Sequence, residues 1–158
     1  MHCELISFDL DGTLVDTASE ISEAANLALQ AHGIARQPVA EITDLIGAGT
    51  RELMLKLLAR RFLEQPALAQ SVRPEAVLAS FDQHYAMTTG TSALAYHGCR
   101  EALLQLKQAG VRLACTTNKE LRHARRVLAA TRLEGYLIWS SAAIPCRKKS
   151  RIVRCSTT

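Results

Sequence analysis

Two aspartates near the N-terminus are the residues of this 158-residue chain best suited to chemistry. Asp9 and Asp11 directly follow the apolar stretch 5–8, and Gly12 comes next. Because side chains alternate along a strand, carboxylates at i and i+2 leave its end on the same side of the chain. Such a pair can hold a hard cation, and one carboxylate can attack phosphorus while the other transfers a proton.

Two other interpretations of the aspartate pair compete with this one. Asp and Gly are common in turns, so the segment can also be a strand-to-turn junction with two solvated acids. A calcium loop also begins Asp-x-Asp, but its fifth position should be Asp or Asn and its sixth should be Gly. Thr13 and Leu14 occupy those positions, which excludes the calcium loop.

The elements predicted around the pair give an α/β fold, a partial Rossmann-like parallel sheet with a helical cap inserted after the first strand. Residues 17–91 read as the cap with its linker, and residues 1–16 and 92–158 as an incomplete core domain. Within the cap we expect a capping box at Thr17–Glu20, a helix capped by Thr50 and a helix beginning at Pro74. The core alternates helices with apolar strands, which predicts parallel strands covered by helices.

A second polar segment follows the strand predicted at 111–115. The strand ends in Thr116, Thr117 and Asn118, of which Thr117 and Asn118 are the candidate phosphate-binding residues and Thr116 is the alternative register. Ligands of open α/β sheets bind beyond the carboxyl ends of the strands, so Asp9, Asp11 and Thr117 are expected to meet there. A hydroxyl and neighbouring backbone N–H groups suit phosphate oxygens.

These two segments together resemble the haloacid dehalogenase superfamily, and within it the phosphoglycolate phosphatases. The resemblance covers residues 1 to about 136: Asp9 to Thr13 match the first motif, and Thr117 matches the second. It implies a phosphatase in which Asp9 forms an aspartyl phosphate and Asp11 acts as acid and base. It also implies Mg²⁺ bound through Asp9 and Asp11, and a small phosphorylated metabolite of carbohydrate metabolism, 2-phosphoglycolate or a sugar phosphate, as substrate.

Two further residues near these motifs have competing interpretations. Arg51 follows the glycine-rich segment 46–50, which is either a helix–helix turn or a cap loop that brings Arg51 to an anionic substrate. A glycine-rich loop at this place is similar to that of phosphoglycolate phosphatases. Lys119 is a tempting catalytic lysine, but at the start of a helix we expect it to be solvated. The histidines have no metal-ligand spacing and receive no role.

Composition and charge argue against nucleic-acid-binding, membrane-associated and disulfide-bonded classes of protein. Residues 1–134 hold 14 Lys and Arg against 15 Asp and Glu, so the overall charge of +4 comes from the C-terminal segment. We therefore expect no nucleic-acid or membrane partner. Five widely spaced cysteines without a Cys-x-x-Cys pair favour a reduced, cytoplasmic protein.

The C-terminal segment departs from the pattern that the resemblance implies. The family also needs a lysine in a Lys-Pro context and a later acidic motif, but no Asp or Glu follows Glu134. Residues from about 137 onward can be a frameshifted reading, because a shifted frame can encode a strand followed by Lys-Lys-Pro. We therefore expect a truncated or frameshifted C-terminus and an inactive chain, with a non-catalytic phosphate-binding fragment as the alternative function.

Overall fold

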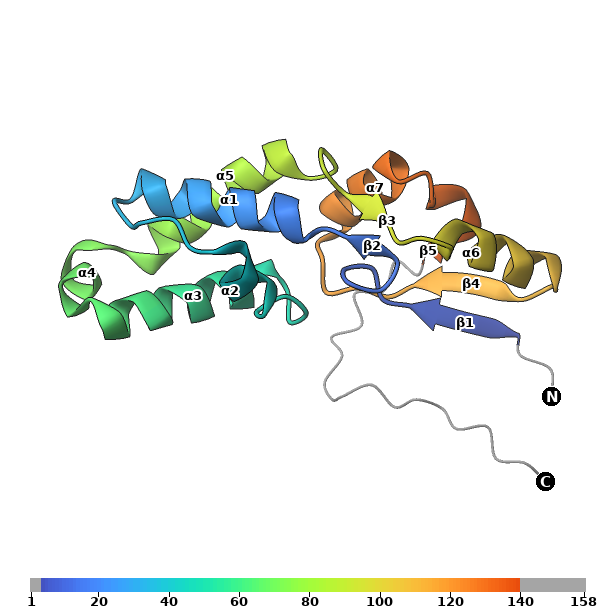
Figure 1. Cartoon of the computed structure of the whole chain (residues 1–158), viewed down its shortest axis with the longest axis horizontal. Helices are drawn as coiled ribbons and strands as arrows, with labels where there is room; N and C mark the ends of the chain where they lie inside the picture. The colour runs from blue at the N-terminus through green and yellow to red at the C-terminus, as the bar shows by residue number, and fades with distance from the viewer. Residues whose placement is uncertain (1–3, 140–158) are drawn as a thin grey trace, which may run out of the picture.

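The computed structural model describes residues 4–139, and Figure 1 shows a helical part at one end and an α/β part at the other. The predicted C-terminal frameshift falls mostly on residues 140–158, outside the described residues. The helical part contains α1 (Ala18–Ala31), α2 (Val39–Thr43), α3 (Thr50–Glu64), α4 (Pro66–Ser71) and α5 (Pro74–Thr88). The remaining elements are β1 (Leu5–Phe8), β2 (Val15–Asp16), β3 (Leu94–Ala95), α6 (Cys99–Gln108), β4 (Arg112–Cys115), α7 (Leu121–Ala130), a 3₁₀ turn (Glu134–Tyr136) and β5 (Ile138–Trp139).

The predicted α/β fold with parallel strands is confirmed. β4 lies between β1 and β5, and both pairings are parallel. The register places Phe8 opposite Cys115, so the segments that follow β1 and β4 leave the sheet at the same edge. Leu113, Val127 and Leu128 belong to the buried apolar cluster that joins this sheet to its helices.

The helical part has its own apolar core. α1 packs along α5, and α3 completes the cluster with Leu53, Met54, Leu57 and Leu58. These four side chains lie at i, i+1, i+4 and i+5, one face of a helix, and all are buried. Two separate buried clusters therefore support the two parts of the chain.

Two predicted helix caps, those at Thr17 and Thr50, are wrong. Thr17 precedes α1 but makes no capping bond, because its hydroxyl donates to Asp11 instead. The carboxylate of Asp16 accepts from the Ala18 N–H and takes over the capping role. At α3 the residue before the helix is Gly49, and Thr50 is the first helical residue. The start of α5 at Pro74 is confirmed.

The two connections between the parts lie side by side. β2 in the first connection pairs antiparallel with β3 in the second, so that Val15 faces Ala95. Just before β3, the Gly90 N–H donates to the Glu20 carboxylate on α1 at 2.7 Å. The sequence did not predict this short ribbon, since two-residue strands leave too few residues for a periodic pattern.

Replacing Gly90 with Ala tests how tightly this crossing is packed. Gly90 has φ +80°, and an added Cβ would lie 3.2 Å from the Arg126 carbonyl oxygen. Gly110 is a matched control, since it also has φ +80° but no atom within 4 Å of an added Cβ. We expect Gly90→Ala to lower the free energy of unfolding by about 1–3 kcal/mol. The loss should be larger than that of Gly110→Ala, and denaturant titration of both variants measures it. Equal losses would show that the contact with Arg126 has no energetic effect.

None of the helices between residues 4 and 139 combines the length and the apolar content that a bilayer crossing requires.

Candidate functional site

The aspartate pair lies on a tight loop that leaves β1. Leu10, between the two aspartates, is fully buried, and its carbonyl oxygen accepts from the backbone N–H groups of Leu14 and Val15 at 3.1 Å. Gly12 adopts φ +78°, a conformation that L side chains rarely adopt. The buried Leu10 therefore anchors the loop and holds Asp9 and Asp11 at the sheet edge.

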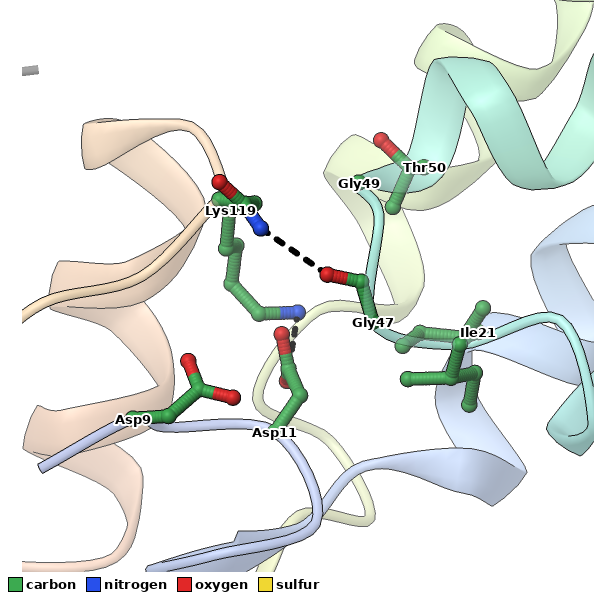
Figure 2. Close-up of a pocket in the computed structure, with 9 residues that line it drawn as sticks. Asp9, Asp11, Ile21, Gly47, Gly49, Thr50 and Lys119 are labelled. Atoms are coloured by element: carbon green, nitrogen blue, oxygen red, sulfur yellow. Dashed lines mark hydrogen bonds and ion pairs between the residues drawn. The ribbon is translucent and has the colours of Figure 1, made fainter. Parts of the chain in front are cut away.

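Asp11 is held by two donors on a single carboxylate oxygen. The Thr17 hydroxyl donates to Asp11 Oδ1 at 2.6 Å, and Lys119 Nζ lies 3.1 Å from the same oxygen. Lys119 comes from the segment after β4, more than a hundred residues away in sequence. Figure 2 shows its side chain reaching down to Asp11, with Asp9 alongside.

The prediction that Lys119 is solvated is wrong. Its side chain is only 1% exposed, and it is ion-paired with Asp11. Its Nζ also donates to the hydroxyl of Tyr85 on α5. The sequence offered a signal for Lys119, its place beside the second motif, but offered none for Tyr85, which reads as one more apolar-face residue of its helix.

Asp9 is in a less polar setting than an ordinary surface acid. Burial raises the pKa of the Asp9 carboxyl, and the nearby charge of Asp11 raises it further. The Leu10 backbone N–H, the Lys119 charge and a hydrogen bond from Thr117 act in the opposite direction on this pKa. The net effect is a raised pKa, so this environment disfavours the charged form of Asp9.

The structure places Thr117 beside this pair and Thr116 away from it. Thr117 hydrogen-bonds to Asp9, and its Oγ1 also accepts from the Lys119 backbone N–H at 3.1 Å. Thr116 lies 2.5 Å from the Ser7 hydroxyl on β1. This arrangement favours Thr117 over Thr116 as the phosphate-binding hydroxyl, an assignment that remains a prediction.

The cap loop lies directly against the core segment. Asn118 Nδ2 donates to the Gly47 carbonyl oxygen at 2.9 Å, and a Cβ on Gly49 would lie 3.5 Å from the Asn118 carbonyl. Figure 2 shows Gly47, Gly49 and Thr50 opposite Lys119. The space left between the loop and the aspartates is about 20 Å³, enough for roughly one water.

Arg51 does not reach the aspartate pair. It is exposed and lines a neighbouring open hollow of about 290 Å³, together with Thr50, Glu52 and Asn118. Because Asn118 and the loop residues Gly49 and Thr50 border both spaces, the hollow adjoins the site. The structure thus brings Asp9, Asp11 and Thr117 together and leaves Arg51 at the rim.

Cys115 at the end of β4 does not compete with the aspartates as a nucleophile. The residue is buried, and burial raises the pKa of its thiol to about 11, with smaller contributions from Asp9 and Asp11. A cysteine reacts as the thiolate, which this environment disfavours.

The oxygen atoms of Asp9 and Asp11 suit a hard cation that keeps most of its water ligands. Within residues 4–139 no three His, Cys, Asp or Glu side chains gather closely enough to form a metal cage. Mg²⁺ commonly binds through one or two carboxylates plus waters and substrate phosphate. The Asp9 carboxylate and the Asp11 backbone carbonyl are oxygen donors of this kind, and a bound cation would favour the charged form of Asp9 that burial disfavours.

The acid pair follows a strand of a parallel sheet, and a helical insertion packs over it. This architecture is found in a class of hydrolases. The sequence model of the haloacid dehalogenase-like hydrolases matches residues 3–147. The chain therefore belongs to the haloacid dehalogenase-like hydrolase family.

Within this family, the proteins that the chain resembles include phosphoglycolate phosphatases. Over 137 residues the chain is 40% identical to a plasmid-encoded phosphoglycolate phosphatase of Cupriavidus necator, covering 87% of this chain and 57% of that protein. It is 33% identical to a phosphoglycolate phosphatase of Nitrosospira multiformis, covering 90% and 63%. A crystal structure of a predicted phosphoglycolate phosphatase from Haemophilus somnus superposes with a TM-score of 0.75 at 25% identity, covering 87% and 61%. The chain thus spans about three fifths of the length of these relatives.

Proposed function

We propose that this chain carries the acid-pair site of a Mg²⁺-dependent phosphatase that hydrolyses a small phosphomonoester, with 2-phosphoglycolate as the preferred substrate and a sugar phosphate as the alternative. The observation that carries the proposal is the meeting of Asp9, Asp11 and Thr117 at one edge of the sheet. Similarity to phosphoglycolate phosphatases supports the choice of substrate. We propose that the protein acts in the cytoplasm, in keeping with the free thiols of Cys99 and Cys115.

In the proposed mechanism, a carboxylate oxygen of Asp9 attacks phosphorus and forms an aspartyl phosphate. Asp11 donates a proton to the departing ester oxygen and then takes one from the water that hydrolyses the intermediate. The Thr117 hydroxyl and the Asn118 segment orient the transferring phosphoryl group. Mg²⁺, held by Asp9 and the Asp11 carbonyl, would offset the negative charge of the phosphoryl group.

Arg51 is proposed to select the substrate. It lines the hollow beside the site, where a carboxylate attached to a bound phosphate could meet its guanidinium. The neighbouring Glu52 lines the same hollow with a negative charge, so it weakens the attraction of a substrate carboxylate to Arg51. The rim position suits recognition of the part of the substrate that does not react.

Reversing the charge of Arg51 tests its role in selection. Arg51→Glu should raise the apparent KM for 2-phosphoglycolate by the loss of a charged hydrogen bond, about 1.5–3 kcal/mol, with a smaller effect on phenyl phosphate. Arg60→Glu is the control, since Arg60 is exposed on the same helix about 13 Å further along its axis. Steady-state kinetics on both esters provides the measurement. Equal effects on the two esters would make Arg51 a structural residue.

The proposed activity is tested by assaying this chain on phenyl phosphate and 2-phosphoglycolate with Mg²⁺ and with EDTA. The C-terminal departure from the family pattern predicts an inactive chain, but the meeting of Asp9, Asp11 and Thr117 favours activity. We therefore expect turnover that EDTA abolishes and that is faster on 2-phosphoglycolate. A second function, phosphate binding without turnover, would need only the polar groups that Thr117 and Asn118 bring to the sheet edge. Isothermal titration with orthophosphate separates the two functions. Binding without turnover supports the second function, and the absence of both binding and turnover would contradict both functions.

A further inference from the structure

We propose that Lys119 is a positioning residue for Asp11, and that Tyr85 of the cap helix α5 holds Lys119 in that position. The inference builds on the proposed function, because it takes Asp11 as the group that transfers the proton. It adds a link that no motif in the sequence indicates, from a tyrosine of the helical part to the acid of the core.

The surroundings of Lys119 favour this role. Its side chain is 99% buried, and lysine is almost never fully buried unless it is paired. Its ammonium meets Asp11 Oδ1 at 3.1 Å, donates to the Tyr85 hydroxyl and lies 4.9 Å from the centre of the Tyr85 ring. The burial of this charge is therefore offset by one carboxylate, one hydroxyl and one aromatic face.

Tyr85 is itself fixed by packing. It is 1% exposed, stacks on Phe81 at 5.2 Å between ring centres and lies 4.5 Å from the ring of His123 on α7. Burial raises the pKa of its hydroxyl, so the group stays neutral and can accept from the ammonium. The neighbouring Thr89 hydroxyl bonds to His123 Nδ1 at 2.9 Å, which ties the end of α5 to the core.

The geometry at Asp11 explains what the positioning achieves. Thr17 and Lys119 both bond to Oδ1, so the position of this oxygen and with it the side-chain rotamer of Asp11 are restrained, and Oδ2 is the oxygen available to carry the transferred proton. Thr17 approaches from the first connection to the cap, and Lys119 from the segment after β4. Without Lys119, Thr17 alone would leave the carboxylate free to rotate about its Cα–Cβ bond.

The decisive variant is Lys119→Met, which keeps an unbranched side chain and removes the charge. Esters with poor leaving groups need the acid, whereas those with good leaving groups do not. We expect the pre-steady-state rate of the first step to fall about 10- to 100-fold with phenyl phosphate, and less than about threefold with 2,4-dinitrophenyl phosphate. The control is Lys107→Met, whose lysine is exposed on α6 and bonds to the Gly135 carbonyl.

Tyr85→Phe tests the second part of the proposal and leaves the lysine in place. It should give the same leaving-group dependence at a smaller magnitude, and Lys119→Met/Tyr85→Phe should be no slower than Lys119→Met alone. Tyr96→Phe, at an exposed tyrosine, is the control. Should Lys119→Met fail to fold, Tyr85→Phe decides the question. Additive losses in the double variant would overturn the link through Lys119.

A readout that needs no turnover separates this inference from the proposed function. The χ1 angle of Asp11, measured by NMR from three-bond couplings to Cγ, should be a single rotamer in the unaltered chain and averaged in Lys119→Met and Tyr85→Phe. If the unaltered chain shows no turnover, the proposed function fails while the rotamer still decides the inference. An unchanged rotamer, or equal losses on both esters restored by Lys119→Arg, would overturn it in favour of a charge acting directly on phosphate.

Discussion

Asp9→Asn is expected to reduce phosphatase turnover by about 10⁴-fold or more, the scale observed when a covalent nucleophile is removed. Asn has nearly the same shape as Asp but is a far weaker nucleophile, so the aspartyl phosphate should not form. The substitution should be tolerated by the fold, since burial and the Asp11 charge both disfavour the charged form of Asp9. The measurement is steady-state turnover of phenyl phosphate with Mg²⁺.

The control for Asp9 is Asp82→Asn, which removes an exposed carboxylate from α5. It should retain the rate of the unaltered chain. Because Asp9 contributes little favourable charge interaction to folding, Asp9→Asn should melt at or above the temperature of the unaltered chain. A variant that folds and keeps its rate would rule out Asp9 as the nucleophile.

Asp11→Asn should cause the second-largest loss, about 10²–10⁴-fold on phenyl phosphate, which is the usual contribution of a positioned acid or base. Asn can still accept hydrogen bonds from Thr17 and Lys119 but cannot donate the proton to the leaving oxygen. The loss on 2,4-dinitrophenyl phosphate should be smaller in the first step, although hydrolysis of the intermediate still needs a base. Pre-steady-state bursts measured on both esters separate the two steps.

Asp11→Asn should also affect stability, in contrast to Asp9→Asn. It leaves the buried ammonium of Lys119 without its carboxylate partner. Loss of the carboxylate charge that compensates the buried ammonium should cost about 1.5–3 kcal/mol, the scale of interactions with a charged group, which denaturant titration can measure. A variant that is as stable as the unaltered chain and fully active would contradict both the acid–base role of Asp11 and the importance of its ion pair.

Much of the fold could be predicted because the sequence carries strong local signals. The strand before Asp9 and the helix that begins at Pro74 follow from apolar patterns and a helix-start proline. The parallel sheet follows from the alternation of strands and helices. Asp9 and Asp11 stand out because their spacing is itself the chemical signal.

The rest depends on contacts between residues distant in sequence. A Thr followed three residues later by Glu is a capping signal, yet the Thr17 hydroxyl binds Asp11 and the Glu20 carboxylate accepts from Gly90. Lys119 at a helix start reads as solvated until Tyr85 and Asp11 are seen to surround it. Tertiary hydrogen bonds override local propensity at these positions, and each lies where the cap meets the core.

The junction between cap and core is also where small changes should have the largest indirect effects. The Glu20 carboxylate is buried, and burial raises its pKa, while the Gly90 N–H and the charge of Lys119 lower it. Glu20, Lys119 and Asp11 therefore form a group of interacting charges near the N-terminal end of α1. A change in any one of them alters the electrostatic setting of the acid.

The central claim, that Asp9 is the nucleophile of a phosphoryl transfer, is tested most directly by trapping the intermediate. The chain is incubated with Mg²⁺ and 2-phosphoglycolate, quenched in acid, reduced with borohydride and digested for mass spectrometry. The account predicts that Asp9 is converted to homoserine in a substrate-dependent manner, and that Asp9→Asn abolishes this product. Turnover without modification of Asp9, or modification of a different residue, would contradict it.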